Sequence, residues 1–98
     1  MILIESIKMD IRIKRTFAKQ YEKAPKNIRW AFDQRIVIFR QDPFHPFLHN
    51  HALTGVYKGY RSINITGDWR ALYKEVLLDD NKVIIEFHLL GTHSQLYQ

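Results

Sequence analysis

Histidine is the residue in this chain best suited to proton transfer near neutral pH, because its unperturbed pKa is about 6.5. The 98 residues include five histidines, three of them crowded into one short segment: His45, His49, His51, His88 and His93. Such a cluster also raises the question of metal binding. Pro46 interrupts the segment, which excludes a helical pair of histidine ligands, and there is no cysteine to complete a structural zinc site. We therefore predict no metal and no cofactor.

Taken singly, the other polar residues of interest have ordinary structural explanations. Asp68 lies in a turn, where an aspartate side chain bonds nearby backbone N–H groups. His88 lies inside an apolar run, which favours a packed or edge histidine. His93 follows the last strand-like run and either caps a short C-terminal segment or is exposed. Function must therefore be sought in combinations of residues.

The charge of the chain is uneven and positive. The formal net charge is +5, and residues 1–40 hold ten Lys and Arg against four acids, which are Glu5, Asp10, Glu22 and Asp33. A domain this basic is suited to bind phosphate, because each phosphate contact releases condensed counterions. Simple solubility is the alternative explanation. The charge alone leaves nucleic acid and solubility equally open.

The composition indicates one soluble domain over residues 1–98. No apolar run approaches the roughly 20 residues of a membrane span, and the first residues do not resemble a signal peptide. The absence of cysteine excludes disulfides and thiol nucleophiles, and it fits a reducing compartment. We expect a cytoplasmic protein with no membrane partner.

The N-terminal half predicts a strand followed by two helices. Residues 8–14 alternate between apolar and polar, which is typical of a half-buried strand, and the residues before them either extend this strand or fray. A helix is expected over Thr16–Ala24, with Thr16 as its cap. A second is expected over Lys26–Arg40, where apolar residues recur at helical spacing. Together these two helices form a helical hairpin.

The C-terminal half predicts three strands, over Tyr60–Ile65, Trp69–Leu77 and Val83–Leu90. Turns at 66–68 and 79–81 join them as an antiparallel meander, and Gly91 ends the last strand before a short terminal piece. Residues 43–58 form a long connection that its apolar side chains hold against the body, and such loops are often functional. The fold is α+β, with the helices on one face of the sheet and the other face available to a ligand.

Three segments together resemble a known family. They read Asn-His-Ala-Leu-Thr-Gly-Val-Tyr-Lys-Gly-Tyr-Arg at 50–61, Gly-Asp-Trp-Arg-Ala-Leu-Tyr-Lys at 67–74 and Gly-Thr-His-Ser-Gln-Leu-Tyr at 91–97. In this order they resemble the YafQ branch of the RelE superfamily of toxins. The resemblance is rich in motifs over the C-terminal half, whereas the N-terminal half is similar only in its element order. It implies a RelE-like fold.

The resemblance also implies a function. Such toxins belong to type II toxin-antitoxin systems and act as ribosome-dependent endoribonucleases, or mRNA interferases, in which the 2′-hydroxyl of the mRNA attacks the adjacent phosphate. By position it gives His93 as general acid and His51, supported by Asp68, as general base. The same match suggests that four further residues meet RNA. Lys58 and Arg61 would hold phosphate, Tyr97 would stack on a base and Asn64 would form a hydrogen bond.

Two departures from the family pattern leave other functions open. Asn64 stands where YafQ has a histidine, and asparagine cannot exchange a proton near pH 7. Leu89 and Leu90 precede Gly91, where the family often has an arginine. These departures favour a non-enzymatic toxin such as the ParE inhibitors of DNA gyrase, or a catalytically silent module that binds only its antitoxin or RNA. In each case an acidic, partly disordered antitoxin that folds on binding is the expected partner, in a toxin-antitoxin hetero-oligomer.

Overall fold

A five-stranded mixed sheet forms the centre of the computed structural model, which describes residues 8–79 and 82–97. The strand order is β1-β5-β4-β3-β2. Along the chain the elements are β1 (Lys8–Ile13), α1 (Arg15–Lys23), α2 (Lys26–Gln41), the 3-10 turn η1 (Pro46–Leu48), β2 (His51–Ala52), the 3-10 turn η2 (Gly55–Tyr57), β3 (Arg61–Thr66), β4 (Trp69–Asp79), β5 (Lys82–Thr92) and α3 (His93–Leu96). The predicted α+β class, helical hairpin and antiparallel meander are confirmed.

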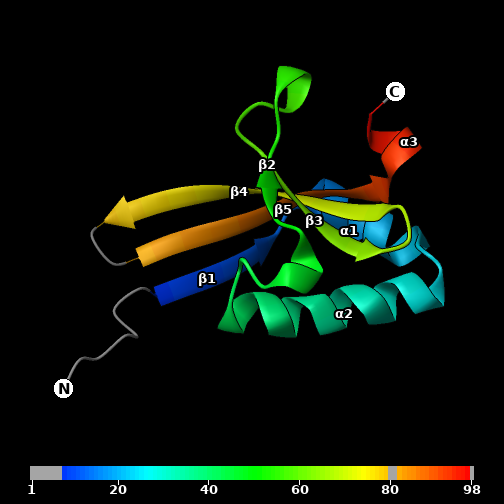
Figure 1. Ribbon diagram of the computed structural model, residues 1–98, viewed down its shortest axis with the longest axis horizontal. Helices are drawn as coiled ribbons and strands as arrows, with labels where there is room; N and C mark the ends of the chain where they lie inside the picture. Colours follow the sequence, from blue (N-terminus) through cyan, green and yellow to red (C-terminus); the bar gives the residue numbers. More distant parts are fainter. Residues whose placement is uncertain (1–7, 80–81, 98) are drawn as a thin grey trace.

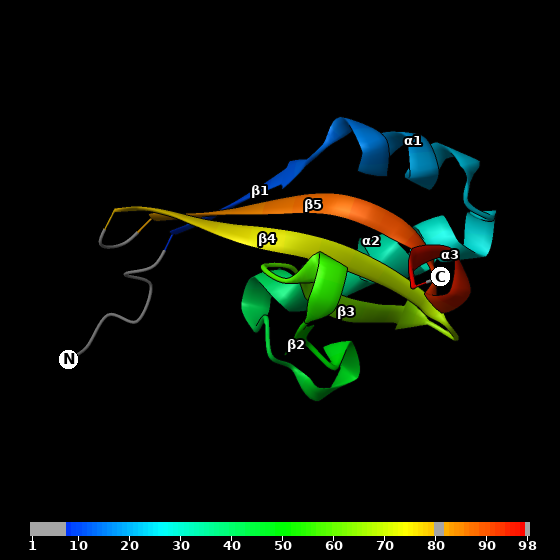
Figure 2. The same cartoon turned by 90° about the horizontal axis from the view of Figure 1, so that it is seen from above.

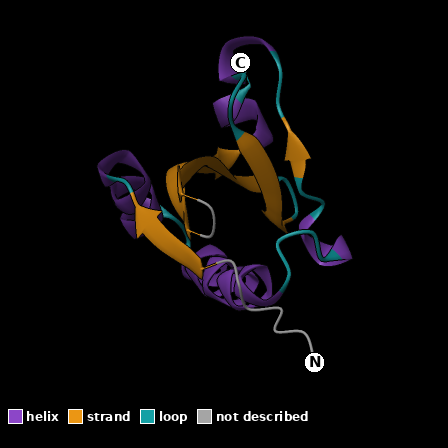
Figure 3. Ribbon diagram, turned by 90° about the vertical axis from the view of Figure 1, so that its left-hand side faces the viewer, coloured by secondary structure: helices purple, strands orange, loops and turns teal. Residues whose placement is uncertain are grey.

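The sheet has one covered and one open face (Figure 1). Helices α1 and α2 lie against one side, whereas η2 and α3 rise from the other. Figure 3 shows the same division in an end-on view, with the twisted sheet between the helix pair and α3. We call the face opposite α1 and α2 the open face. Among the described residues, no helix is long and apolar enough to cross a membrane.

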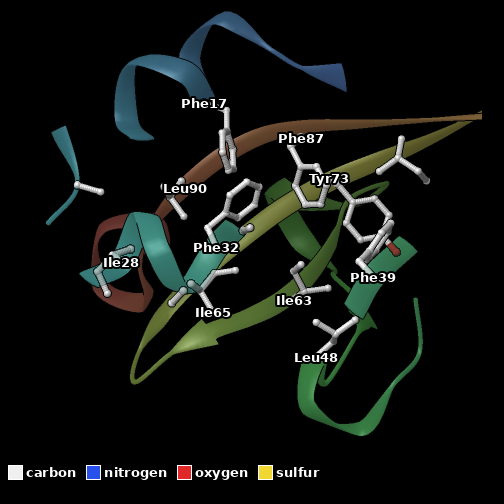
Figure 4. Packing of buried hydrophobic residues seen from close by; sticks show 14 residues of the cluster. Phe17, Ile28, Phe32, Phe39, Leu48, Ile63, Ile65, Tyr73, Phe87 and Leu90 are labelled. Atoms are coloured by element: carbon white, nitrogen blue, oxygen red, sulfur yellow. The ribbon is translucent and has the colours of Figure 1, made fainter. Parts of the chain in front are cut away.

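Aromatic rings form much of the core between the helices and the sheet (Figure 4). Phe17 of α1 and Phe32 of α2 lie 5.0 Å apart, and both contact Phe87 of β5 at 5.7 and 5.5 Å. At the other end of α2, Phe39 meets Tyr73 at 5.2 Å. Each fully buried side chain of this size contributes about 1.5–3 kcal/mol through removal of apolar surface from water. The predicted helical stripe therefore packs the core.

Two strand pairings lie outside the predicted meander. β1 pairs in parallel with β5, from Lys8↔Lys82 to Ile13↔Phe87, which places β5 inside the sheet. β2, which lies within the segment 43–58 that we expected to be a loop, pairs with β3. That segment is held to the body by Leu48, which is fully buried, whereas Phe44 and Phe47 are 60% and 64% exposed. The long connection is thus largely structured.

Several predicted boundaries are wrong for local reasons. α1 begins at Arg15 with Lys14 as its N-cap, and Thr16 caps nothing, because Lys14 still donates its backbone N–H to Phe87 of β5 at 2.9 Å. Gly91 does not end β5 but pairs with Arg70 inside it. A Cβ at Gly91 would lie 3.3 Å from the Leu96 side chain, so glycine here lets α3 fold back closely. The residues before Lys8 and part of the predicted turn at 79–81 lie outside the described residues.

Candidate nucleic-acid interface and active site

A groove of about 320 Å³ opens on the open face where β2, β3, β4 and α3 meet. Residues from β2 with its flanking loops, β3, β4 and the α3 segment line it: His49, His51, Leu53, Ser62, Asn64, Arg70, His93 and Tyr97. Four of the seven residues predicted from the sequence are therefore brought together, namely His51, Asn64, His93 and Tyr97. We call this feature the groove.

His51 is held by the backbone of its own loop. It lies on β2 directly opposite Ser62 of β3. Its Nδ1 atom is 2.9 Å from the carbonyl oxygen of His49. Because a carbonyl oxygen only accepts hydrogen bonds, Nδ1 must carry the hydrogen in this contact. In the neutral ring, Nε2 is then unprotonated and free to accept a proton.

The carbonyl that fixes His51 belongs to a residue in an uncommon conformation. His49 ends η1 with φ 46° and ψ 48°, and it is the only non-glycine residue with a positive φ in the described ranges. Histidine tolerates this left-handed region better than most side chains do. The ring of His49 lies 5.4 Å from that of His51 and also lines the groove. His49 was not among the site residues expected from the sequence.

His93 and Tyr97 come from the short helix α3. Thr92 caps this helix, accepting from Gln95 N while the Gln95 side chain accepts from Thr92 N, which is a complete capping box. The backbone N–H of His93 also donates to the carbonyl oxygen of Asp68 at 2.8 Å. The rings of His93 and Tyr97 are 4.7 Å apart. These contacts fix the start of α3 beside the β3–β4 turn.

Two polar atoms of the groove lack a hydrogen-bond partner. Ser62 and Asn64 project from β3 to the open face, and Ser62 is fully buried. The Ser62 hydroxyl and the Asn64 Oδ1 atom are both buried and unpartnered. A buried polar group without a partner costs about 1–3 kcal/mol. Two residues that line the groove therefore each have a buried polar atom that is unsatisfied in this structure.

Arg70 supplies a cation that we did not expect at this site. It lies on β4 opposite Asn64 and faces the groove. Its Nη1 atom donates to the carbonyl oxygens of Gly67 and Trp69 at 2.9 and 3.0 Å, which holds the guanidinium in place. The sequence did contain a signal for this position, because Arg70 is adjacent in the chain to Trp69 and Ala71, both on the covered side.

Three predicted site residues lie elsewhere. Arg61 points toward the helices, where it donates from Nε to Asn50 Oδ1 at 2.8 Å and lies 5.2 Å above the Phe44 ring. Lys58 follows η2, is exposed and does not line the groove. Asp68 contributes its backbone carbonyl, and no hydrogen bond joins its carboxylate to His51 in the described structure. The support that we assigned to Asp68 is provided by the His49 carbonyl.

Asn50 connects this region to the core. Its Nδ2 atom donates to the Pro43 carbonyl and to the Tyr73 hydroxyl at 2.9 and 2.8 Å. Burial raises the pKa of Tyr73 above its usual value. Asn50 therefore fixes the loop that carries His49 and His51 onto β4. Within residues 8–79 and 82–97, no three potential ligands gather into a metal site.

Residues 9–98 match the model of a family described as a bacterial toxin of type II toxin-antitoxin system, YafQ. The chain belongs to the YafQ family of toxins. No individually curated protein matches it. Among solved structures, the chain is similar to that of the Escherichia coli DinJ–YafQ toxin-antitoxin complex, with 27% identity and a TM-score of 0.59, covering 94% of this chain and 100% of the other.

Two more distant structures share the fold of this YafQ-family toxin. The YoeB/ParE toxin from Agrobacterium tumefaciens has a TM-score of 0.70 at 19% identity, covering 87% of this chain and 99% of the other. The RelBE2 toxin-antitoxin complex from Mycobacterium tuberculosis has a TM-score of 0.65 at 19% identity, covering 86% and 96%. At this identity they show the fold alone, and the expected RelE-like architecture is confirmed.

Proposed function

We propose that this YafQ-family toxin is an endoribonuclease that cleaves mRNA on the ribosome through attack of a 2′-hydroxyl on the adjacent phosphate. The observation that supports the proposal is the placement of His51, His93 and Arg70 around one groove of an electropositive domain. Such a reaction needs a base, an acid and a cation beside the phosphate. The groove contains one residue suited to each role.

His51 acts as the general base. Its Nδ1–H is held by the His49 carbonyl, so its Nε2 accepts the proton of the 2′-hydroxyl. His93 acts as the general acid and donates a proton to the departing 5′ oxygen. The reaction yields a 2′,3′-cyclic phosphate and a 5′-hydroxyl. Since asparagine does not titrate, Asn64 takes no part in the proton transfers.

Arg70 stabilises the charge that develops on the phosphorane. The chain lacks the arginine that the family often has before Gly91, but the strand register offers a substitute. Leu72 of β4 lies opposite Leu89 of β5, and Arg70 is two residues from Leu72 on the same face. Arg70 is therefore a diagonal neighbour of position 89, within reach for a long side chain.

The remaining groove residues bind the RNA. Ser62 and Asn64 Oδ1 form hydrogen bonds with the nucleotide next to the cleaved bond, which satisfies their buried polar atoms. Tyr97 stacks on a base. Lys58, which is exposed after η2 and outside the groove, attracts the phosphate backbone of the RNA through its charge.

We further propose a cognate antitoxin as the partner that restrains this activity in the cytoplasm. Two of the similar structures, DinJ–YafQ and RelBE2, are toxin-antitoxin complexes. An acidic, partly disordered chain fits a protein with a net charge of +5 and an open sheet face.

The test is cleavage of a ribosome-bound message by purified toxin, read by primer extension. We expect His51→Ala and His93→Ala each to slow cleavage by about 10²–10⁴-fold, the usual contribution of general acid–base catalysis. His45→Ala is the matched control, because His45 caps η1 outside the groove. If the wild-type toxin left the message intact, the proposal would be overturned. Inhibition of DNA gyrase would then be the next activity to test.

A further inference from the structure

A second hollow lies on the open face, beside the groove. It has a volume of about 370 Å³ and is lined by Lys14, Arg15, Thr16, Tyr60, His88 and Leu89. Lys14, Arg15 and Thr16 come from the start of α1, and His88 and Leu89 come from β5. Figure 2 looks onto this face and shows α1 beside β5, with α3 at the end of β5. We call this feature the outer hollow.

The charges around the outer hollow are mainly positive. Arg15 is exposed. Lys74 lies 4.5 Å above the Tyr60 ring. The one carboxylate in the cluster, Glu86, is already engaged, since it lies 3.1 Å from His88 Nε2 and 4.0 Å from Lys14 Nζ. The outer hollow therefore favours an anionic group.

A series of aromatic rings joins the groove to the outer hollow. The series starts in the groove, where His93 contacts Tyr97, and continues from Tyr97 to Tyr57 at 5.6 Å. Tyr57 contacts Tyr60 at 5.8 Å, and Tyr60 contacts His88 at 5.5 Å. The Tyr57 hydroxyl donates to the Leu96 carbonyl at 2.7 Å, which fixes η2 against α3. The two hollows are thus connected by rings that are held in place.

We propose that the outer hollow is a second RNA-backbone site, which holds a phosphate of the same strand that occupies the groove. Single-stranded RNA is bound elsewhere by this combination of aromatic rings for the bases and fixed cations for the backbone. Arg15 and Lys14 bind the phosphate, and the strand passes over Tyr97 and Tyr57. The inference rests on the proposed function for the identity of the ligand.

The test compares two non-cleavable 2′-O-methyl RNAs, a trinucleotide and a dodecanucleotide, by fluorescence anisotropy. We expect Arg15→Gln to weaken dodecanucleotide binding about 3–10-fold and to leave trinucleotide binding unchanged. The slope of log affinity against log salt should fall by about 0.7, the loss of one phosphate contact on a single strand. Arg40→Gln is the matched control, because Arg40 is exposed in the last turn of α2, on the covered side, and its loss changes the net charge equally.

Equal effects of Arg15→Gln and Arg40→Gln, or equal effects on the two RNAs, would overturn the second site. Cleavage of ribosome-bound message by the wild type separates this result from a failure of the proposed function. If the wild type cleaves and Arg15→Gln binds the dodecanucleotide normally, only the second site is wrong. If the wild type neither cleaves nor binds either RNA, the proposed function and the second site are both wrong.

Discussion

The Nδ1 atom of His51 lies 2.9 Å from the carbonyl oxygen of His49, a residue whose backbone is left-handed. This contact determines which nitrogen of His51 carries the hydrogen, and it depends on the backbone of His49 rather than on its ring. A carboxylate would perform the same task through a charge. Here a neutral carbonyl does so, and the loop conformation sets its direction.

Replacing His49 separates the role of its backbone from that of its ring. Glycine adopts the left-handed conformation without strain, so His49→Gly should keep message cleavage within about 3-fold of the wild type. Valine is a genuine outlier in that region, so His49→Val should shift the carbonyl and lower cleavage further. Primer extension gives the rates, and thermal unfolding checks that both variants fold. A loss in His49→Gly as large as that in His51→Ala would assign a chemical role to the His49 ring.

Arg70 should be the main cation of the reaction. Removal of one preorganised donor from a charge-stabilising site typically costs about 10²–10³ in rate, and we expect this loss for Arg70→Ala. Arg70→Lys should recover part of the rate, because it keeps the charge and loses the planar donor group. Arg12→Ala is the control, since Arg12 forms an exposed ion pair with Asp10 on β1. Wild-type cleavage by a folded Arg70→Ala protein would contradict this role.

Ser62→Ala should stabilise the free protein and weaken RNA binding. The mutation removes a buried hydroxyl that has no partner, so we expect a gain of about 1 kcal/mol. A gain of this size raises the melting temperature of a domain of this length by roughly 4–8 °C. Differential scanning calorimetry and RNA anisotropy measure the two effects. Ser94→Ala, at an exposed position of α3, should change neither. Lower stability in Ser62→Ala would mean that the hydroxyl has a partner in solution.

Glu86 should make the stability of the protein depend on pH in the acid range. The hydrogen bond with His88 lowers the pKa of Glu86 below its usual value of 4.5; partial desolvation acts against this, and the charges of Lys14, His88 and Lys74 add to it. Because the pKa of Glu86 is lower in the folded than in the unfolded state, its carboxylate stabilises the fold above pH 4.5. This stabilisation is lost as the pH falls through the pKa of the folded state.

Urea unfolding between pH 3 and pH 7 tests this contribution. Wild type should exceed Glu86→Gln in stability near neutral pH, and the two curves should converge as the pH falls below about 4.5. Glu22→Gln is the control, because Glu22 is exposed on α1. A difference between the wild type and Glu86→Gln that stays constant with pH would show that the Glu86–His88 contact does not form in solution.

The local elements of the fold were predictable because their patterns are local. The helical spacing of apolar residues from Ile28 to Phe39 predicted α2, and the alternation of side chains in Tyr60–Ile65 predicted the strand β3. The pairing of β1 with β5 was not predictable, since no local pattern states which distant strand will be its neighbour. β2 was missed for a different reason, because two residues are too few to show a period.

The candidate site was predicted in part, and one error could have been avoided. Arg61 and Asn64 are three residues apart on the same strand, so their side chains point to opposite faces and only one of them can reach the groove. The same alternation places Arg70 on the groove face. The role of the His49 carbonyl could not be read from the sequence, because it depends on a backbone conformation that histidine adopts only occasionally.

The parallel pairing of β1 with β5 has a consequence for how this protein folds during its synthesis. The partner of Lys8 is Lys82, so β1 cannot pair until a segment 74 residues further along the chain has been synthesised. His93 follows that segment. Contacts this distant along the chain form late, after the long intervening loop has closed. The pairing of β1 with β5 and the groove lined by His93 and Tyr97 therefore form only after β5 and α3 have been translated. A truncated product that stops before β5 should therefore lack both the strand that pairs with β1 and the α3 side of the groove.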